Sequence, residues 1–155
     1  MSGNPPRQQA PELERKRWMA VLARADAAET RRLLAACAPL PAHTRLRGPE
    51  TGLVMVRGRA GGGGAAFNLG ETTVTRCSVR TETGQVGHAY LAGRDAEQAE
   101  LAALLDAVLQ DPARRGEITE AVIAPLARSQ AEQRERIARK AAATQVQFFT
   151  MANMR

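Results

Sequence analysis

Four consecutive glycines, Gly61 to Gly64, stand between two strand-like runs and constrain the fold more than any other segment of this chain. Ordering such a segment costs much backbone entropy, because glycine has the widest conformational freedom of all residues. A run of this kind is typical of a loop whose backbone approaches something closely or needs several positive φ angles. The pattern therefore predicts a loop that touches a ligand, touches a partner, or turns a tight corner.

The segments on both sides of the glycine loop favour β-structure. Residues 53–59, 72–80 and 86–92 read as strands, and the second of them is rich in β-branched side chains. A short turn at 82–84, with a glycine at its end, joins the last two strands, and the glycine loop joins the first two. These connections predict an antiparallel meander of three or more strands.

Helical patterns flank the predicted meander. We expect N-terminal helices over residues 11–25, with Trp18 on the apolar side, and over 27–36. A central amphipathic helix follows the strands, with Asp95 as its N-cap and Gln98 completing a capping box. An apolar piece at 118–126 is interrupted by a proline. The fold class is therefore predicted to be α+β.

The C-terminal part of the chain predicts a surface for another molecule. Residues 127–142 have strong helix propensity but few large apolar side chains, so a long helix here is exposed or lies against another chain. Residues 146–151 alternate like a strand and contain Phe148, Phe149 and Met151. We expect this terminal strand to dock against something and to act as an assembly tail.

Composition bounds the domain organisation and the compartment. At 155 residues we expect one domain over residues 11–151, after a Pro-, Gln- and Asn-rich segment, 1–10, that is predicted to be disordered. The two cysteines, Cys37 and Cys77, have no CxxC spacing, which fits a reducing, cytoplasmic setting. The sequence has no signal peptide and no long apolar run, so we expect no membrane partner.

The charge balance favours anionic partners. The formal net charge is +6, from 22 Lys and Arg against 16 Asp and Glu, and nearly all the cations are arginine. Arginine suits bidentate contact with phosphate or carboxylate. An Arg-rich nucleic-acid binder is one alternative, but no basic segment is interleaved with aromatic residues for base stacking. An Arg-rich solvated surface is another.

The glycine loop does not match the common nucleotide-binding loops. Gly61, Gly63 and Ala66 fit G-x-G-x-x-A, but that fingerprint needs a helix to follow in a parallel βαβ unit. Here a turn at 67–70 and another strand are predicted instead. A Walker A loop is excluded because no Gly-Lys-Ser/Thr follows.

Arginines on the two strands beside the loop form the strongest candidate site. Arg57 and Arg59 share one face of a strand, and Arg76 and Arg80 share a face of the next, because side chains alternate with period two. If the two faces coincide, four guanidiniums converge beside the free backbone N–H groups of Gly61–Gly64. That arrangement would suit a phosphate, a phosphonate or an acidic partner. The alternative is the solvated face of a one-sided sheet.

Catalytic chemistry is not visible in the sequence. His43 and His88 have no ligand-like neighbours, so we expect no metal site, and no cofactor is expected in this chain. Glu71 and Asp95 have no visible paired carboxylate. No catalytic residue is assigned, and the chain is predicted to be a non-catalytic or catalytically incomplete subunit.

Several runs of the sequence, taken together, resemble one known family. They are residues 17–23, 50–53, 59–80, 93–95 with 99–100, 124–126, and Phe-Phe-Thr-Met at 148–151. In this order and spacing they are similar to the G subunit of the bacterial carbon–phosphorus lyase system, the PhnG family. The resemblance covers roughly residues 15–151. The chain departs from it mildly at Gly63, where relatives often carry threonine, and at 87–90, where the aromatic residue comes later than usual.

The resemblance implies an accessory role in phosphonate use. The family works in a cytoplasmic core complex of G, H, I and J subunits, with an accessory L subunit, at a step where a phosphonate displaces adenine from ATP. The product is a ribose 1-phosphonate 5-triphosphate. The resemblance places the nucleosidase chemistry in the I subunit, and the iron–sulfur cluster and S-adenosylmethionine chemistry in the J subunit. ATP is then a substrate of the complex, and direct phosphate or phosphonate binding by this chain stays an alternative to a purely accessory role.

Overall fold

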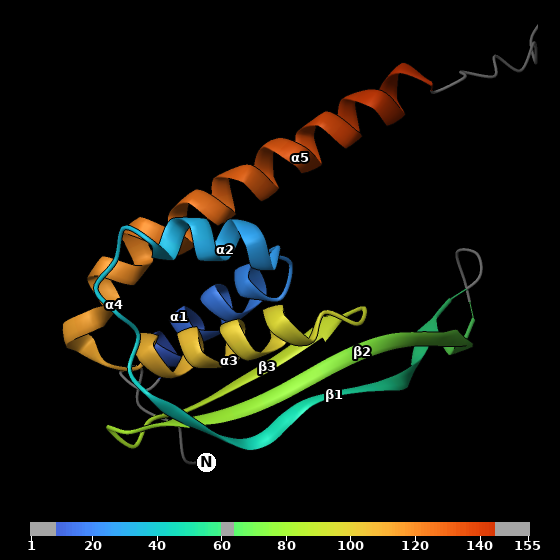
Figure 1. Ribbon diagram of the computed structural model, residues 1–155. Helices are drawn as coiled ribbons and strands as arrows, with labels where there is room; N and C mark the ends of the chain where they lie inside the picture. The colour runs from blue at the N-terminus through green and yellow to red at the C-terminus, as the bar shows by residue number, and fades with distance from the viewer. Residues whose placement is uncertain (1–8, 60–63, 145–155) are drawn as a thin grey trace, which may run out of the picture.

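The protein folds as a three-stranded antiparallel sheet with its described helices on one face (Figure 1). The computed structural model describes residues 9–59 and 64–144. The elements are α1 (Gln9–Leu22), α2 (Ala27–Leu34), β1 (His43–Gly58), β2 (Phe67–Thr81), β3 (Val86–Ala92), α3 (Ala96–Leu109), α4 (Pro112–Ile118), a π-helical turn η1 (Thr119–Ile123) and α5 (Ala124–Ala143). The predicted α+β class and the antiparallel meander are confirmed. The predicted terminal strand at 146–151 lies outside the described residues.

The strands are longer than the sequence predicted. β1 starts at His43, ten residues before the predicted start, and β2 starts at Phe67, so the predicted turn at 67–70 was wrong. Pro49 lies within β1, which is an edge strand whose pairing with β2 shifts register on both sides of Arg47. An edge strand with bulges accommodates a proline because the missing N–H is not needed by a second neighbour.

Helix α3 covers the inner face of the sheet and forms the centre of the core. Thr75, Cys77 and Val79 of β2 point inward and are buried. The approach of β3 is closest at Gly87, where an added Cβ would lie 1.9 Å from the carbonyl oxygen of Ala103. Trp18 of α1 packs into the same core, as predicted.

The caps and turns follow the sequence in part. The 82–84 turn is present, with Gly84 at φ +93° and its N–H donating to the carbonyl of Thr81 at 2.9 Å. Asp95 caps α3 by accepting from the N–H of Gln98 at 2.9 Å. The predicted capping box is only half formed: Nε2 of the buried Gln98 donates to the carbonyl of Leu22, and its Oε1 accepts no hydrogen bond from the described residues. That carbonyl, at the end of α1, also accepts from the backbone N–H of Ala25 at 3.3 Å.

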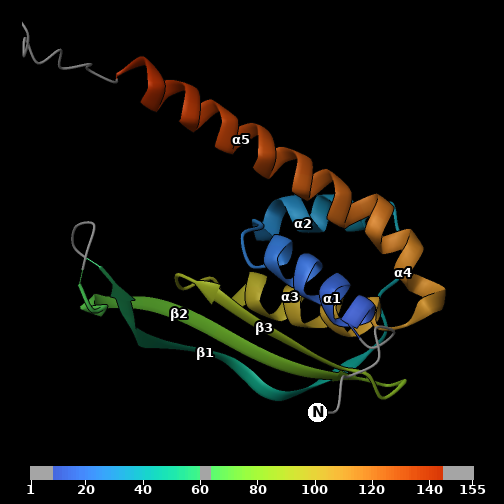
Figure 2. The ribbon, with the colours of Figure 1, turned by 180° about the vertical axis from the view of Figure 1, so that it is seen from behind.

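The predicted break at Pro125 is a π-turn within a continuous helical run. The run extends from Pro112 to Ala143 through η1, where the N–H of Ala124 donates to the carbonyl of Thr119, five residues earlier. The wider turn lets the chain pass a proline that has no N–H to donate. Helix α5 therefore begins beside the body and then projects away from it (Figures 1 and 2).

Candidate functional site

The glycine loop stands at the tip of a two-stranded ribbon. β3 ends at Ala92, opposite Val74 of β2, whereas β1 and β2 continue together to Gly58 and Phe67. Figures 1 and 2 show this ribbon extending past the helical layer. Gly64 has φ +123°, a conformation that favours glycine. Gly61, Gly62 and Gly63 lie outside the described residues.

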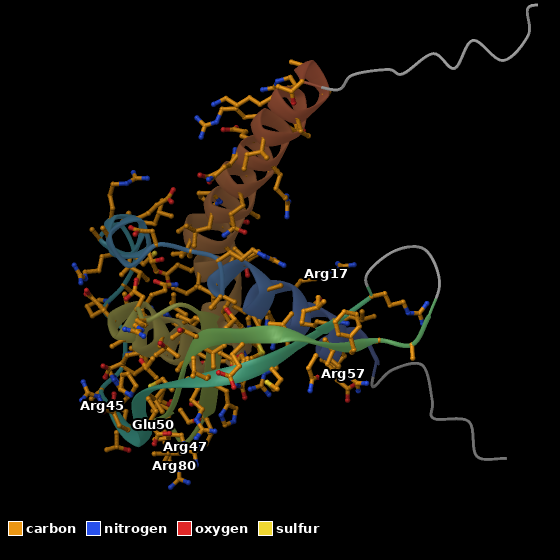
Figure 3. All side chains as sticks on the ribbon, turned by 90° about the vertical axis from the view of Figure 1, so that its right-hand side faces the viewer. Arg17, Arg45, Arg47, Glu50, Arg57 and Arg80 are labelled. Atoms are coloured by element: carbon orange, nitrogen blue, oxygen red, sulfur yellow. The ribbon has the colours of Figure 1, made fainter. Side chains whose placement is uncertain are left out.

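The four predicted arginines do not converge. Arg57 is opposite Asn68, whereas Arg76 is opposite Glu50 and Arg80 is opposite Thr44. Eight positions on β2 separate Asn68 from Arg76, which is about 26 Å at roughly 3.3 Å per residue. Figure 3 shows Arg57 well apart from the group that contains Arg80. The prediction of one four-arginine site is wrong, because the strand register separates the pairs.

Arg57 and Arg59 belong to the tip of the ribbon. The Arg57 guanidinium donates to the carbonyl of Ala66 at 3.2 Å, which links the two sides of the loop. Arg59 follows the end of β1, so it does not share a strand face with Arg57 as predicted. These two cations are the predicted anion contacts that remain beside Gly64.

Arg76 and Arg80 lie on the outer face of the sheet, with a different set of neighbours. Arg76 contacts the Glu50 carboxylate at 3.1 Å, and Arg47 approaches the same carboxylate at 3.9 Å. Figure 3 shows Arg45, Arg47, Glu50 and Arg80 gathered at this end of the sheet. Sequence reasoning missed the contributions of β1 because residues 43–52 were not predicted as a strand.

A partly buried carboxylate ties the start of β1 to α3. Glu100 accepts two hydrogen bonds from Arg45, at 2.8 and 2.7 Å, and lies 3.0 Å from Nε2 of His43. The hydrogen bond from Arg45, assisted by that from His43, lowers the pKa of Glu100 against the opposing effect of burial. This cluster holds the strand that carries Arg47, so its role is positioning within the fold.

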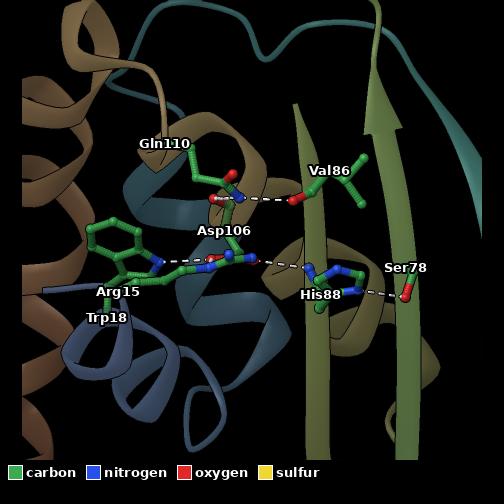
Figure 4. A network of polar contacts seen from close by, with 7 residues as sticks. All are labelled: Arg15, Trp18, Ser78, Val86, His88, Asp106 and Gln110. Carbon is green, nitrogen blue, oxygen red and sulfur yellow. Dashed lines mark hydrogen bonds and ion pairs between the residues drawn. The ribbon is translucent and has the colours of Figure 1, made fainter. Parts of the chain in front are cut away.

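The most buried polar network surrounds Asp106 on α3 (Figure 4). Its Oδ1 accepts from Nε of Arg15 at 3.0 Å and from Nε1 of Trp18 at 2.9 Å. Its Oδ2 accepts from Nη2 of Arg15 at 2.7 Å and from the backbone N–H of His88 at 2.9 Å. The Asp106 side chain is fully buried. It joins α1, α3 and β3, which makes it a structural centre.

Sequence reasoning missed Asp106. The one available signal was a carboxylate inside the apolar run 101–109, because a buried charge needs a partner. The side-chain partners, however, come from 88 and 91 residues earlier in the chain.

The ribbon beyond β3 carries several exposed apolar side chains. We call residues 53–58 of β1 and 67–73 of β2 the ribbon arm. Its inner face continues the face that carries the buried Thr75, because Thr51 is opposite Thr75 and their hydroxyls lie 3.2 Å apart. Leu53 and Met55 of β1 lie on this face, and Thr73 and Glu71 of β2 are opposite them. Four large apolar side chains of the ribbon arm are exposed: Leu53 (63%), Met55 (56%), Phe67 (50%) and Leu69 (54%).

Helix α5 is the second element that leaves the body. Leu126 is buried, but every residue from Glu132 to Thr144 is exposed, including Ile137. The helix carries five cations and two carboxylates. The predicted assembly residues Phe148, Phe149 and Met151 follow it and lie outside the described residues.

Metal binding and membrane crossing find no support in the described part. Within residues 9–59 and 64–144, no three His, Cys, Asp or Glu side chains are grouped to hold a metal ion. Among the same residues, no helix combines the length and apolar character needed to cross a bilayer.

These features define a small α+β protein in which a ribbon arm and a helix extend from the body. The family described as "Phosphonate metabolism protein PhnG" matches residues 13–153, and the chain belongs to this family. A relative from Rhizobium meliloti (strain 1021) is 48% identical over 138 residues, which cover 89% of this chain and 88% of the relative. That relative is named "Alpha-D-ribose 1-methylphosphonate 5-triphosphate synthase subunit PhnG". The resemblance drawn from the sequence motifs is confirmed.

Proposed function

We propose that this chain is an accessory subunit of an α-D-ribose 1-methylphosphonate 5-triphosphate synthase. The observation that carries the proposal is the 48% identity to a subunit of that name over 89% of the chain. Near-complete coverage of both proteins means that the relation extends over the whole fold. The proposed role places the chain in phosphonate catabolism.

The reaction of the complex displaces adenine from ATP by the phosphonate. ATP is a substrate of the assembly, and this chain holds no cofactor of its own. The H, I and J subunits and the accessory L subunit are the expected partners, in the cytoplasm. The iron–sulfur cluster and S-adenosylmethionine are expected in the J subunit.

Three carboxylates of the described fold stabilise structural elements, which favours an accessory role. Asp106 accepts four hydrogen bonds in the core, Glu100 holds Arg45, and Asp95 caps α3. A general acid or base must be free to exchange its proton with a substrate. The chain therefore contributes surface to the assembly and leaves the chemistry to its partners.

Direct binding of phosphate groups is the second candidate function. Arg57 supports it, because its guanidinium lies beside the glycine loop, at 3.2 Å from the Ala66 carbonyl. Calorimetric titration of the full chain with ATP and with methylphosphonate tests this role. Saturable binding that is lost in Arg57→Gln/Arg59→Gln and kept in Arg76→Gln/Arg80→Gln would support it. DNA binding with a steep salt dependence would instead favour the nucleic-acid alternative.

Co-expression tests the leading proposal. The tagged chain is expressed with the other subunits of its synthase, purified and assayed for adenine release from ATP and methylphosphonate. We expect the chain to copurify with them and to release no adenine alone. Adenine release by the purified chain alone, or failure of wild-type chain to copurify, would contradict the proposal.

A further inference from the structure

The outer edge of β1 carries backbone groups that have no strand beside them within the described residues. The sheet order β1-β2-β3 makes β1 an edge strand, and no residue from His43 to Gly58 is buried. An edge strand presents a row of N–H and C=O groups with which a further strand can pair. Natural proteins usually hinder such pairing with charges, prolines, bulges or covering side chains. Each edge of this sheet can therefore be compared for these features.

The pairing register shows which backbone groups of β1 point outward. The N–H of Gly93 donates to the carbonyl of Thr73 at 2.8 Å, which makes these two residues a hydrogen-bonded pair. Such pairs recur at every second position of an antiparallel ladder. The odd-numbered residues of β2 therefore face β3, and its even-numbered residues over 70–76 face the even-numbered residues over 50–56 of β1. The residues between them direct their N–H and C=O groups to the outer edge of β1, and they are Thr51, Leu53 and Met55.

The opposite edge of the sheet is partly covered by side chains of α3 (Figure 4). Oδ2 of Asp106 accepts from the backbone N–H of His88 at 2.9 Å. Nε2 of Gln110 donates to the carbonyl of Val86 at 2.8 Å. Both backbone groups belong to even-numbered residues of β3, which face away from β2 by the same alternation. The first half of the β3 edge is therefore closed to a further strand.

Two other stretches of edge carry charges or irregular pairing. Residues 45–49 of β1 contain two arginines and a proline, and the pairing shifts register on both sides of Arg47. Beyond the end of β3, the edge of β2 contains Glu71, and its pairing with β1 shifts register between Val56 and Arg57. Charges, proline and bulges all hinder the addition of a strand. These stretches are therefore poor sites for pairing.

Residues 51–56 have none of these features. The run Thr-Gly-Leu-Val-Met-Val contains no charge and no proline, and its pairing with β2 shows no register shift. Apolar side chains lie on both faces, because Leu53 and Met55 point to the inner face and the valine after each points to the outer face. Leu53 and Met55 are 63% and 56% exposed. An exposed, regular, apolar edge of this kind favours pairing with another strand.

A second copy of this chain fits this edge poorly. The two-fold symmetry of a dimer pairs equal strands antiparallel. Pairing of two copies about Leu53 would put Pro49 opposite Arg57 of the other copy, and would bring Arg47 toward its Arg59. The proline offers no N–H at that position, and the arginines repel one another. Symmetry repeats both penalties, whereas a segment of a different chain meets neither.

We propose that residues 51–56 of β1 pair with an extended segment of a different protein chain, which joins the sheet as a further strand. The partner segment is of similar length, and it is apolar or β-branched on both faces. Main-chain hydrogen bonds supply the affinity in this mode of recognition, and alternate side chains supply the specificity. The inference rests on the proposed function, because the partner would be another subunit of the synthase. It adds the residues that make the contact and the conformation of the segment that they bind.

Hydrogen exchange of backbone amides tests the pairing without any substitution. The full chain is compared alone and in the complex with its co-expressed subunits, by mass spectrometry of peptides that span residues 50–58. In the free chain, the outward amides of Thr51, Leu53 and Met55 should exchange fast and the even-numbered amides slowly. Assembly should slow the exchange of the outward amides as well. An assembled complex in which these amides still exchange fast would overturn the inference.

A proline at an outward position separates backbone pairing from side-chain contact. Met55→Pro removes an N–H that points away from β2, and proline is tolerated at such positions of edge strands. Met55→Thr is the matched control, because it removes the same side chain, keeps the N–H and suits a strand. Met55→Pro should assemble more weakly than Met55→Thr by about tenfold or more, because a carbonyl of the partner loses its donor. Equal affinities of two variants with the wild-type circular dichroism spectrum would show that the contact does not use the backbone.

Photo-crosslinking identifies the chain that supplies the strand. A benzoylphenylalanine is placed at Leu53, or at Tyr90 on the other edge strand as the control, in the full chain co-expressed with the other subunits. We expect the Leu53 position to crosslink to a short segment of a different subunit, and the Tyr90 position not to reach that segment. Crosslinks from Leu53 only to a second copy or to the chain's own residues 145–155 would overturn the inference. Equal crosslinking of both positions to one segment would place the contact on the face of the sheet instead of its edge.

The outcomes separate the two proposals. If the wild type assembles with the other subunits but the exchange of residues 50–58 does not change, the inference is wrong and the proposed function stands. If the wild type forms no complex with them, the proposed function fails and the inference falls with it.

Discussion

Replacing Asp106 by asparagine should destabilise the protein strongly although the two side chains have the same shape. The carboxylate is fully buried and accepts from Arg15 twice, from Trp18 and from the His88 backbone. The amide of asparagine puts an NH₂ donor where two of those donors converge, and it removes the charge that Arg15 neutralises. Both losses occur away from water, where an unpaired polar group is most costly.

The expected loss is about 3–5 kcal/mol, the range for removing one partner of a buried ion pair. Proteins of this size lose about 2–4 °C of Tm per kcal/mol, so the Tm should fall by about 10 °C. Urea unfolding followed by circular dichroism at pH 7 measures the change, with an unchanged m value showing that the unfolded state is comparable. Glu14→Gln is the matched control, because Glu14 is half exposed and 3.6 Å from Arg115, and should change stability by less than about 1 kcal/mol. A loss below about 1 kcal/mol in Asp106→Asn would refute the argument that this network holds α1, α3 and β3 together.

Three further changes test other parts of the account. Gly87→Ala should destabilise the protein by about 1–3 kcal/mol in urea unfolding, because its Cβ would meet the Ala103 backbone at 1.9 Å; a neutral result would show that β3 moves freely on α3. Glu100→Gln should be less stable than wild type at pH 7. The pKa of Glu100 is lower in the folded than in the unfolded protein, so the ionised carboxylate stabilises the fold at pH values above its unfolded-state pKa of about 4.3. The stability difference between wild type and variant should therefore disappear as the pH falls through the folded-state pKa of Glu100, and a difference that persists at pH 2 would contradict this. Truncation after Thr144 should leave a folded protein, by circular dichroism, that no longer copurifies with the other subunits; wild-type stoichiometry in the truncated protein would show that residues 145–155 are not an anchor.

Local sequence signals predicted the parts of the fold that depend on local physics. The Asp95 cap and the turn at Gly84 need only neighbouring residues, and both formed where expected. The apolar periodicity of the α3 segment identified the helix that covers the sheet. These elements determine the α+β fold class and the antiparallel β-meander.

The features that escaped prediction depend on pairing between distant residues. The four arginines do not meet because the pairing register of β1 and β2 places Arg57 opposite Asn68. The alternation of side chains along each strand does not predict this register. Bulges around Arg47 let β1 continue through residues 43–52, which were not predicted as a strand. The ribbon arm became visible only when the end of β3 at Ala92, opposite Val74, showed where the sheet narrows to two strands.

Reconstitution of adenine release tests the central claim most directly. The other subunits of the synthase are purified without this chain, supplied with ATP and methylphosphonate, and assayed for adenine before and after the full-length chain is added. The account predicts no release by the chain alone, little release by the incomplete assembly, and recovery that saturates at a fixed stoichiometry on addition of the chain. Full activity of the assembly without this chain, or turnover by the chain alone, would contradict its role as an accessory subunit.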